Sequence, residues 1–255
     1  MPTDMAIGAL RRFLGGKTPV VQGPDGARVY AVGDIHGRLD LFEDMIARID
    51  ADRGNTRPTV VLLGDYIDRG AQSKEVVDRL LALPDWADWV LLRGNHEQAL
   101  LEALSDLPQA DRLMRQWLNF GGVETLQSYG VPSTLLYAND LPAIRKDMNA
   151  RFPAAHGALF DSLRLAHRAG GYLFVHAGIR PGIPLSAQDS QDLLWIREDF
   201  LDSRVDHGVV VVHGHSVSPE VVERPNRIGI DTGAYKTGRL TALVIDGGER
   251  RFLTT

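Results

Sequence analysis

The 255-residue sequence contains no cysteine, so it forms no disulfide and no site that uses a thiolate as metal ligand or nucleophile. It has no run of about 18 apolar residues that could span a membrane, and no apolar segment typical of a signal peptide near its N-terminus. It has no excess of positive charge either, because 33 acidic residues outnumber 28 lysines and arginines. A general nucleic-acid binder would be basic. We therefore expect a cytoplasmic protein with neither a membrane nor a nucleic acid as partner.

The first half of the chain alternates apolar runs with helical patterns. The runs at 28–32, 59–63 and 89–92 have the length and composition of strands buried on both faces. After each run, apolar residues recur three and four positions apart, as on one face of a helix. The polar residues that end the three runs lie about 30 residues apart, the length of one βαβ unit. The pattern predicts an α/β fold whose ligands gather at the carboxyl ends of parallel strands.

The first two of these helical patterns predict which side chains of each helix are buried. The first consists of Phe42, Met45, Ile46 and Ile49. In the second, Ser73 is expected to cap a helix that runs to Leu83 and turns Leu81 inward. In the third pattern Leu107 continues the apolar spacing.

Residues 105–165 are predicted to form a helical insertion. It is not expected to be a separate domain, because about 60 residues are too few for a secure core of their own. Within it, Gly121 and Gly122 should stop one helix and Asp140 should cap the next. Further strands are expected at 164–168, 172–175, 209–212, 226–230 and 239–245. We predict one domain over 1–255, with two mixed β-sheets face to face and helices outside. Residues 1–26 would form an N-terminal arm, in which residues 6–10 fit a frayed helix better than a weak membrane anchor.

Polar side chains collect directly after the apolar runs. They are carboxylates, imidazoles and one carboxamide, namely Asp34, His36, Asp65, Asp68, Asn95, His96, His176 and either His213 or His215. Such ligands suit Mn²⁺, Fe or Zn²⁺ and not a soft metal. Asp65 is central in the series and could bridge two ions, which together can activate water and hold a phosphoryl group. One Gly-Asp pair after a strand is usually a turn, but several such matches in order indicate a metal centre.

Five blocks of the sequence resemble the signature motifs of the calcineurin-like metallophosphoesterases. The blocks are Gly33–Gly37, Gly64–Gly70, Gly94–Glu97, His176–Gly178 and Gly214-His215. The Asp-Arg-Gly that ends the second block and the Glu that ends the third resemble the phosphoprotein phosphatase branch, especially its bacterial and phage members. Residues 194–197 and 230–234 resemble that branch as well. The resemblance covers roughly residues 28–245 and implies the four-layer sandwich of the family.

The resemblance also implies a role for each matching residue. Asp34, His36 and Asp65 match the ligands of a first metal ion, and Asp65, Asn95, His176 and His215 match those of a second. Groups that hold phosphate oxygens are matched by Arg69, Asn95 and Arg197. His96 matches the general acid, and Asp68 matches the carboxylate that orients it. The nucleophile would be a metal-bound hydroxide. His213 competes with His215 for the last ligand position, and the order Gly-His-Ser favours His215.

The resemblance implies that the chain is a Ser/Thr protein phosphatase, with phosphotyrosine as a further substrate. It also implies two bound divalent metal ions, for which we expect Mn²⁺, with Fe or Zn²⁺ as alternatives. A nucleotide hydrolase of the same fold is the second hypothesis. Symmetrical diadenosine tetraphosphate hydrolases usually have Gln in place of His36, and phosphodiesterases usually have a second histidine shortly after the position of His215. Both departures favour a monoesterase. A third hypothesis, an inactive binding module, would have lost a ligand or the acid, and none is lost here.

Overall fold

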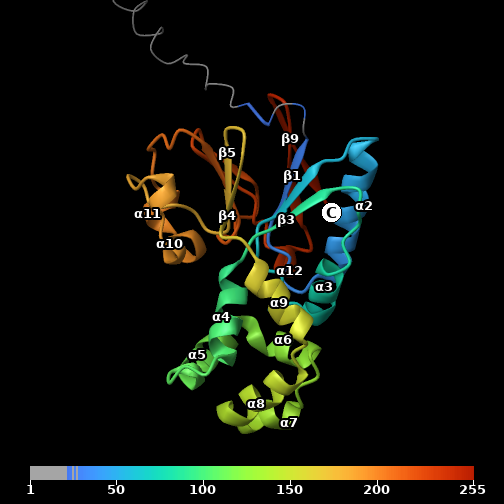
Figure 1. The fold of residues 1–255 in the computed structure, drawn as a ribbon, viewed down its shortest axis with the longest axis vertical. Helices are drawn as coiled ribbons and strands as arrows, with labels where there is room; N and C mark the ends of the chain where they lie inside the picture. The colour runs from blue at the N-terminus through green and yellow to red at the C-terminus, as the bar shows by residue number, and fades with distance from the viewer. Residues whose placement is uncertain (1–21, 25, 27) are drawn as a thin grey trace, which may run out of the picture.

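The structure is a computed structural model that describes residues 22–24, 26 and 28–255. Most of the expected N-terminal arm, including residues 6–10, lies outside the described residues. Figure 1 shows two β-sheets packed against each other, with helices on the outer face of each sheet and a group of helices below them. The fold predicted from the sequence, two mixed sheets flanked by helices, is therefore confirmed.

The first sheet has the strand order β10-β9-β1-β2-β3. Strands β1, β2 and β3 are parallel to one another, while β9 runs antiparallel to both β1 and β10. The bounds are β1 Val29–Val32, β2 Thr59–Leu62, β3 Asp88–Leu91, β9 Thr241–Asp246 and β10 Glu249–Thr254. The parallel part brings the segments after β1, β2 and β3 to one end of the sheet.

The second sheet has the order β4-β5-β6-β8-β7. Strands β5, β6 and β8 are parallel, and the outer strands β4 and β7 are antiparallel to their neighbours. The bounds are β4 Ala166–Ala169, β5 Tyr172–Val175, β6 Val210–His213, β7 Val222–Glu223 and β8 Arg227–Gly229. Both sheets are thus mixed, and each presents the ends of parallel strands to a site between them.

Alternate residues along each strand point to opposite faces, and this divides the core into layers. In β1, Val29 and Ala31 pack between the sheets, whereas Tyr30 and Val32 face the helices outside. From the second sheet, Phe174 and Val212 fill the space between the sheets. Because both faces are covered, these strands are apolar throughout, as the sequence predicts.

Helices α2 (Leu39–Arg53) and α3 (Ser73–Leu80) cover the first sheet, and α10 (Ser190–Trp195) and α11 (Glu198–Leu201) cover the second (Figure 1). Helix α2 buries the four residues expected from its apolar spacing. Helix α3 differs from the expectation. Ser73 is its first residue and not its cap, and the helix ends at Leu80, so that Leu81 is 48% exposed. The short segments η2 (Leu185–Ala187) and α12 (Ala234–Thr237) precede α10 and β9.

Below the sheets lies a helical lobe, which we define as α5 to α9 (Figure 1). The lobe follows α4 (Asn95–Leu104) in the chain. Its elements are α5 Ala110–Trp117, η1 Leu118–Gly122, α6 Val123–Ser128, α7 Ser133–Ala138, α8 Leu141–Arg151 and α9 Ala154–Ser162. Gly121, with φ of 107°, breaks the helix where expected, and the Asp140 side chain caps α8 by accepting from Ala143 N at 3.2 Å. Leu107 falls after α4 and is 45% exposed, against expectation.

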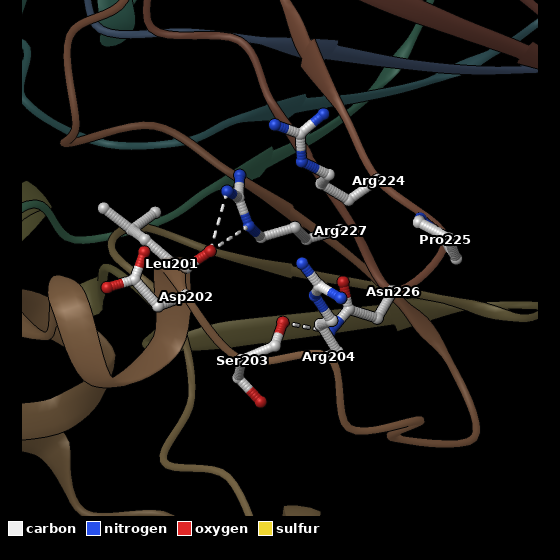
Figure 2. Close-up of a pocket in the computed structure, with 8 residues that line it drawn as sticks. All are labelled: Leu201, Asp202, Ser203, Arg204, Arg224, Pro225, Asn226 and Arg227. Atoms are coloured by element: carbon white, nitrogen blue, oxygen red, sulfur yellow. Dashed lines mark hydrogen bonds between the residues drawn. The ribbon is translucent and has the colours of Figure 1, made fainter.

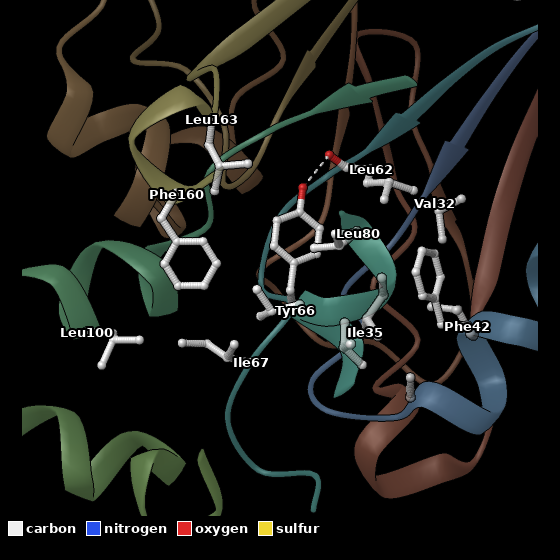
Figure 3. Packing of buried hydrophobic residues seen from close by; sticks show 14 of the residues in the cluster. Val32, Ile35, Phe42, Leu62, Tyr66, Ile67, Leu80, Leu100, Phe160 and Leu163 are labelled. Carbon is white, nitrogen blue, oxygen red and sulfur yellow. Dashed lines mark hydrogen bonds between the residues drawn. The ribbon is translucent and has the colours of Figure 1, made fainter. Parts of the chain in front are cut away.

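The lobe shares its core with the helices that cover the first sheet. Figure 3 shows Phe160 of α9 beside Leu100 of α4 and beside Tyr66 and Ile67 of the loop after β2. The Tyr66 hydroxyl donates to the Leu92 carbonyl at 2.7 Å, which anchors this loop to the end of β3. Within the part of the chain that the structure describes, no helix has both the length and the apolar character to cross a bilayer.

Phe174 is fully buried between the two sheets, so its truncation tests this arrangement. We expect Phe174→Ala to lower the free energy of unfolding by about 3–5 kcal/mol, because it removes apolar contacts and leaves a cavity. Val205→Ala, at a side chain that is 48% exposed, is the matched control and should change stability by less than about 0.5 kcal/mol. Urea unfolding measures both, and equal effects would contradict the assigned core.

Candidate active site

The loops that follow the strands have an unusual backbone. Among the described residues, six that are not glycine have a positive φ, and five of these six are residues that the sequence singled out: His36, Asp65, Asp68, Arg69 and His215. A left-handed conformation costs a residue with a side chain roughly 1–3 kcal/mol, and such residues persist only where the surroundings hold them. The strain of the chain is therefore concentrated where the expected site lies.

The carboxylate of Glu97 holds the turn that carries Asp65. Its Oε2 accepts from the backbone N–H groups of Asp65 at 3.0 Å and Gly94 at 2.9 Å, and Oε1 accepts from Tyr66 N at 2.8 Å. Burial, followed by the negative charge of Asp65, raises the pKa of Glu97 to about 7. No role for Glu97 was predicted from the sequence. The spacing from Gly94 to Glu97, that of a capping box, is the signal that predicts the bond back to Gly94.

Asp65 lies between two groups of imidazoles. Its Oδ2 is 3.5 Å from His36 Nε2 and 3.7 Å from His96 Nε2, and its Oδ1 is 3.4 Å from His176 Nε2. Burial would raise the pKa of Asp65, but the neighbouring histidines outweigh it and lower the pKa below its usual range. Asp65 therefore belongs to both of the residue groups that could hold a metal ion, His36-Asp65-His96 and Asp65-His176-His215. This is the bridging position expected from the sequence.

In the second metal group, Asp65-His176-His215, the histidine rings present nitrogen lone pairs to a common point. His176 Nδ1 is 2.9 Å from the Leu63 carbonyl and must donate to it, so Nε2 carries a lone pair. That Nε2 lies 2.8 Å from Asn95 Oδ1, which in turn lies 2.8 Å from His215 Nδ1. Burial lowers the pKa of His176 and brings that of His215 to about 2, so both rings are neutral. Neutral nitrogens facing a carboxamide oxygen and a carboxylate suit a divalent cation.

In the first group, His36 Nδ1 donates to the Ile67 carbonyl at 2.8 Å, so its Nε2 offers a lone pair to the site. Burial lowers the pKa of His36 to about 3 and keeps the ring neutral. Arg69 Nη1 donates to this Nε2 at 2.9 Å. One lone pair cannot serve both a guanidinium and a cation, so metal binding by His36 requires the Arg69 side chain to move.

Asp34 is buried beside these groups but belongs to neither of them. Its two oxygens accept from the backbone N–H of His215 at 3.0 and 3.3 Å. Burial raises the pKa of Asp34 well above its usual value, and the negative charges of Asp231 and Asp65 raise it further. Asp231 was assigned no role from the sequence, and its Oδ2 is a buried oxygen with no hydrogen-bond partner among the described residues. A cation near Asp34 would relieve this crowding of carboxylates.

His96 and Asp68 form a hydrogen-bonded pair. His96 Nδ1 donates to Asp68 Oδ2 at 2.6 Å, which leaves His96 Nε2 facing the site. Burial alone would lower the pKa of His96, but Asp65 and Asp68 outweigh it and raise the pKa. Arg69 Nη2 lies 3.1 Å from the same Nε2. His96 is thus a member of the first metal group and is also placed to hold a proton.

Two residues of the helical lobe hold Asp68 in turn, and neither contact was predicted from the sequence. Trp117 Nε1 donates to Asp68 Oδ2 at 2.8 Å, and Thr125 Oγ1 donates to Asp68 Oδ1 at 2.6 Å. Trp117 is fully buried. No signal in the sequence links Thr125 to residue 68, because the contact depends on how the lobe folds back.

The rim of the site is aromatic. The Tyr235 ring lies 5.4 Å from the His36 ring and 4.7 Å from the Arg69 guanidinium carbon. Phe120 and Trp195 are in contact, with ring centres 5.9 Å apart, and they line a cavity of about 220 Å³. Arg197 is exposed between α10 and α11. Burial is the main cause of the low pKa of His215, the charge of His176 lowers it further, and the charge of Arg197 contributes less.

His213, the competing ligand, points elsewhere. Its ring lies 5.2 Å from the Phe200 ring, and its Nε2 is 3.4 Å from Arg227 Nη1. It belongs to neither metal group among the described residues. The structure therefore brings His215 into the site and leaves His213 in the layer outside the second sheet.

The different positions of His213 and His215 can be tested by replacing each of the two with glutamine. We expect His215→Gln to weaken Mn²⁺ binding by more than about tenfold, because a ligand nitrogen is lost. His213→Gln, the matched control two residues away, should keep the affinity within about threefold. Titration calorimetry with Mn²⁺ on chelator-treated protein measures both, and the reverse order would assign the ligand to His213.

Two kinds of curated protein are similar to this chain. The symmetrical bis(5'-nucleosyl)-tetraphosphatase of Delftia acidovorans is 34% identical over 153 residues, which are 60% of this chain and 45% of that protein. The serine/threonine-protein phosphatase 2 of Escherichia coli K12 is 28% identical over 229 residues, which are 84% of this chain and 90% of that protein. The match thus spans slightly less than half of the first relative but nearly all of the second.

Solved structures share the fold. A putative diadenosine tetraphosphatase aligns with a TM-score of 0.60 at 22% identity, over 91% of this chain and 95% of the other. A protein-tyrosine phosphatase from a psychrophilic Shewanella aligns with a TM-score of 0.53 at 18% identity, over 89% of this chain and 80% of the other. A family model, that of the calcineurin-like phosphoesterases, matches residues 27–239. The five motifs, the two facing sheets and this match agree, and the chain belongs to the calcineurin-like phosphoesterase family.

Proposed function

We propose that the chain is a metal-dependent phosphomonoesterase that hydrolyses phosphoserine and phosphothreonine in proteins, with phosphotyrosine as a further substrate. The observation that carries this proposal is the His96–Asp68 pair, joined at 2.6 Å beside two groups of potential metal ligands. A serine or threonine alkoxide is a poor leaving group and needs a proton as the P–O bond breaks. A positioned acid typically accelerates such a step by about 10²–10⁴-fold.

Two divalent cations fit the site, and we propose Mn²⁺, with Fe or Zn²⁺ as alternatives. The ligands would be Asp34, His36 and Asp65 for one ion, and Asp65, Asn95, His176 and His215 for the other. When bound, the ions would lower the pKa of a water molecule and neutralise charge on the phosphoryl group. Support comes from the donor set, which consists of neutral imidazoles and oxygens that converge in a buried site.

The protein's own side chains bind and orient the phosphoryl group in this proposal. The Arg69 fork lies between His36 Nε2 and His96 Nε2, so it can meet two phosphate oxygens once it leaves His36. Arg197 would approach from the other side of the site, and Asn95 would contribute its amide. Asp68 accepts the Nδ1 proton of His96, and its charge together with that of Asp65 favours the doubly protonated ring, so that Nε2 would carry the second proton and deliver it to the leaving oxygen. Trp117 and Thr125 keep Asp68 in place.

The second candidate is a symmetrical dinucleoside tetraphosphate hydrolase. Support for it comes from the relatives of that name, of which the Delftia acidovorans protein is 34% identical to this chain. Two observations favour the protein phosphatase. The match to the Escherichia coli phosphatase extends over 90% of that protein, compared with 45% for the tetraphosphatase. His36 occupies the position at which the tetraphosphatases usually carry glutamine.

A substrate panel separates the two candidates. With Mn²⁺-loaded protein, we expect phosphoserine and phosphothreonine peptides to be hydrolysed with higher kcat/KM than diadenosine tetraphosphate or a bis-aryl phosphodiester. Release of inorganic phosphate and chromatography of the nucleotides measure the rates. A higher kcat/KM for diadenosine tetraphosphate would make the chain a nucleotide hydrolase.

The proposed acid role of His96 can be tested apart from metal binding, because the proposed metal ligands do not include His96. We expect His96→Asn to retain both metal ions and to lose about 10²–10⁴-fold in kcat on alkyl phosphates, where a proton is required. The loss should shrink on p-nitrophenyl phosphate, whose leaving group needs less protonation. Asp65→Asn is the matched comparison and should lose metal itself. Metal analysis and kinetics on both substrates test this, and an equal loss on both substrates would remove the acid role from His96.

A further inference from the structure

A second cavity, of about 540 Å³, lies where the turn between β7 and β8 meets the segment that follows α11. Figure 2 shows three arginines around it, Arg204, Arg224 and Arg227, together with the carbonyl of Leu201 and the carboxylate of Asp202. None of the residues proposed for catalysis or metal binding lines it. The cavity is therefore separate from the candidate active site, and its chemistry has to be explained independently.

Arg227 forms the inner wall of the cavity and is only 7% exposed. Its Nε and Nη2 donate to the Leu201 carbonyl at 3.3 and 2.9 Å, and its Nη1 lies 3.4 Å from His213 Nε2. Both partners are uncharged. Burial lowers the pKa of Arg227, and the charge of Arg224 lowers it further, while Asp202 acts in the opposite direction. The guanidinium still remains charged at neutral pH, so a buried positive charge has no direct negative partner.

Arg204 and Arg224 add two further positive charges to the cavity. Arg224 makes one long hydrogen bond, 3.4 Å to the carbonyl of Glu223, and both Arg204 and Arg224 are exposed. Considering residues 22–24, 26 and 28–255, no carboxylate oxygen lies within 4.0 Å of any of the three guanidinium groups. Arg180, near the same outer helices, differs because it pairs with both Asp192 and Asp199. The cavity thus holds three positive charges against the single carboxylate of Asp202, which forms no ion pair with any of the three arginines.

We propose that this cavity binds a small molecule through a phosphoryl group. Guanidinium forks meet two oxygens of a phosphate at once, and three of them around one cavity match a doubly negative group better than a single carboxylate. The volume lies within the range of about 300–1,000 Å³ that is typical of small-molecule sites, and it exceeds what an inorganic phosphate ion fills. A phosphate ester such as a nucleoside monophosphate therefore fits the cavity better than the free ion does.

The test uses titration calorimetry of the full chain with two probes, AMP and inorganic phosphate. Because the candidate active site should bind phosphate as well, every titration is done in the Arg69→Gln background, in which that site is weakened. We expect AMP to bind this protein, and the additional pair Arg204→Gln and Arg224→Gln to weaken its binding by at least about tenfold. Both positions are exposed, so the substitutions should leave the fold intact.

Arg48→Gln is the matched control, because Arg48 is an exposed arginine on α2 that pairs with Asp44. It should leave AMP binding unchanged. If AMP binds more tightly than inorganic phosphate, the ligand is a phosphate ester, and if the two bind equally, it is the free ion; either result supports a phosphoryl site. The proposal is overturned if neither probe binds in the Arg69→Gln background, or if removing the two arginines leaves the binding of both probes unchanged.

Discussion

The site depends on one buried carboxylate, that of Glu97, which accepts hydrogen bonds from backbone N–H groups on two different loops. These bonds join the turn after β2 to the start of α4. They hold Asp65 in a left-handed conformation that an unsupported turn would leave. Because Asp65 belongs to both potential metal groups, the position of either group depends on Glu97. Removing this carboxylate would leave several buried N–H groups without an acceptor, at about 1–3 kcal/mol each.

A second dependence links the helical lobe to the chemistry proposed for the sheets. Asp68 lies in a loop of the first sheet, yet two of its hydrogen bonds come from Trp117 and Thr125 in the lobe. The backbone of the same loop is tied to the lobe as well, since Arg69 N donates to the Gly121 carbonyl at 3.0 Å. Through Asp68 the lobe therefore helps to set the orientation of His96. A change in its packing would alter proton delivery while leaving the proposed metal ligands in place.

The sequence predicted the elements whose signal is local. The helix face that begins at Phe42 is the face that α2 buries, and the polar residues after the strands converge as expected. Periodicity shows which face is apolar but not where a helix ends. The expected burial of Leu81 was therefore wrong, and Leu107, which continues the helical spacing, falls beyond the end of α4. The contact between Asp68 and Thr125 could not be predicted, because 57 residues separate them and neither residue carries a pattern that refers to the other.

The two sheets contribute to the site from opposite parts of the chain, and this has a consequence for synthesis. His36, Asp65 and His96 belong to the first half, whereas His176 and His215 belong to the second. At about 5–20 residues per second, a ribosome adds the segment between His96 and His215 in roughly 6–24 seconds. Throughout that interval the first-half residues are outside or leaving the ribosome without their partners. The group His36-Asp65-His96 can therefore form before β5 and β6 are made, whereas the group Asp65-His176-His215 can form only after β6 has docked.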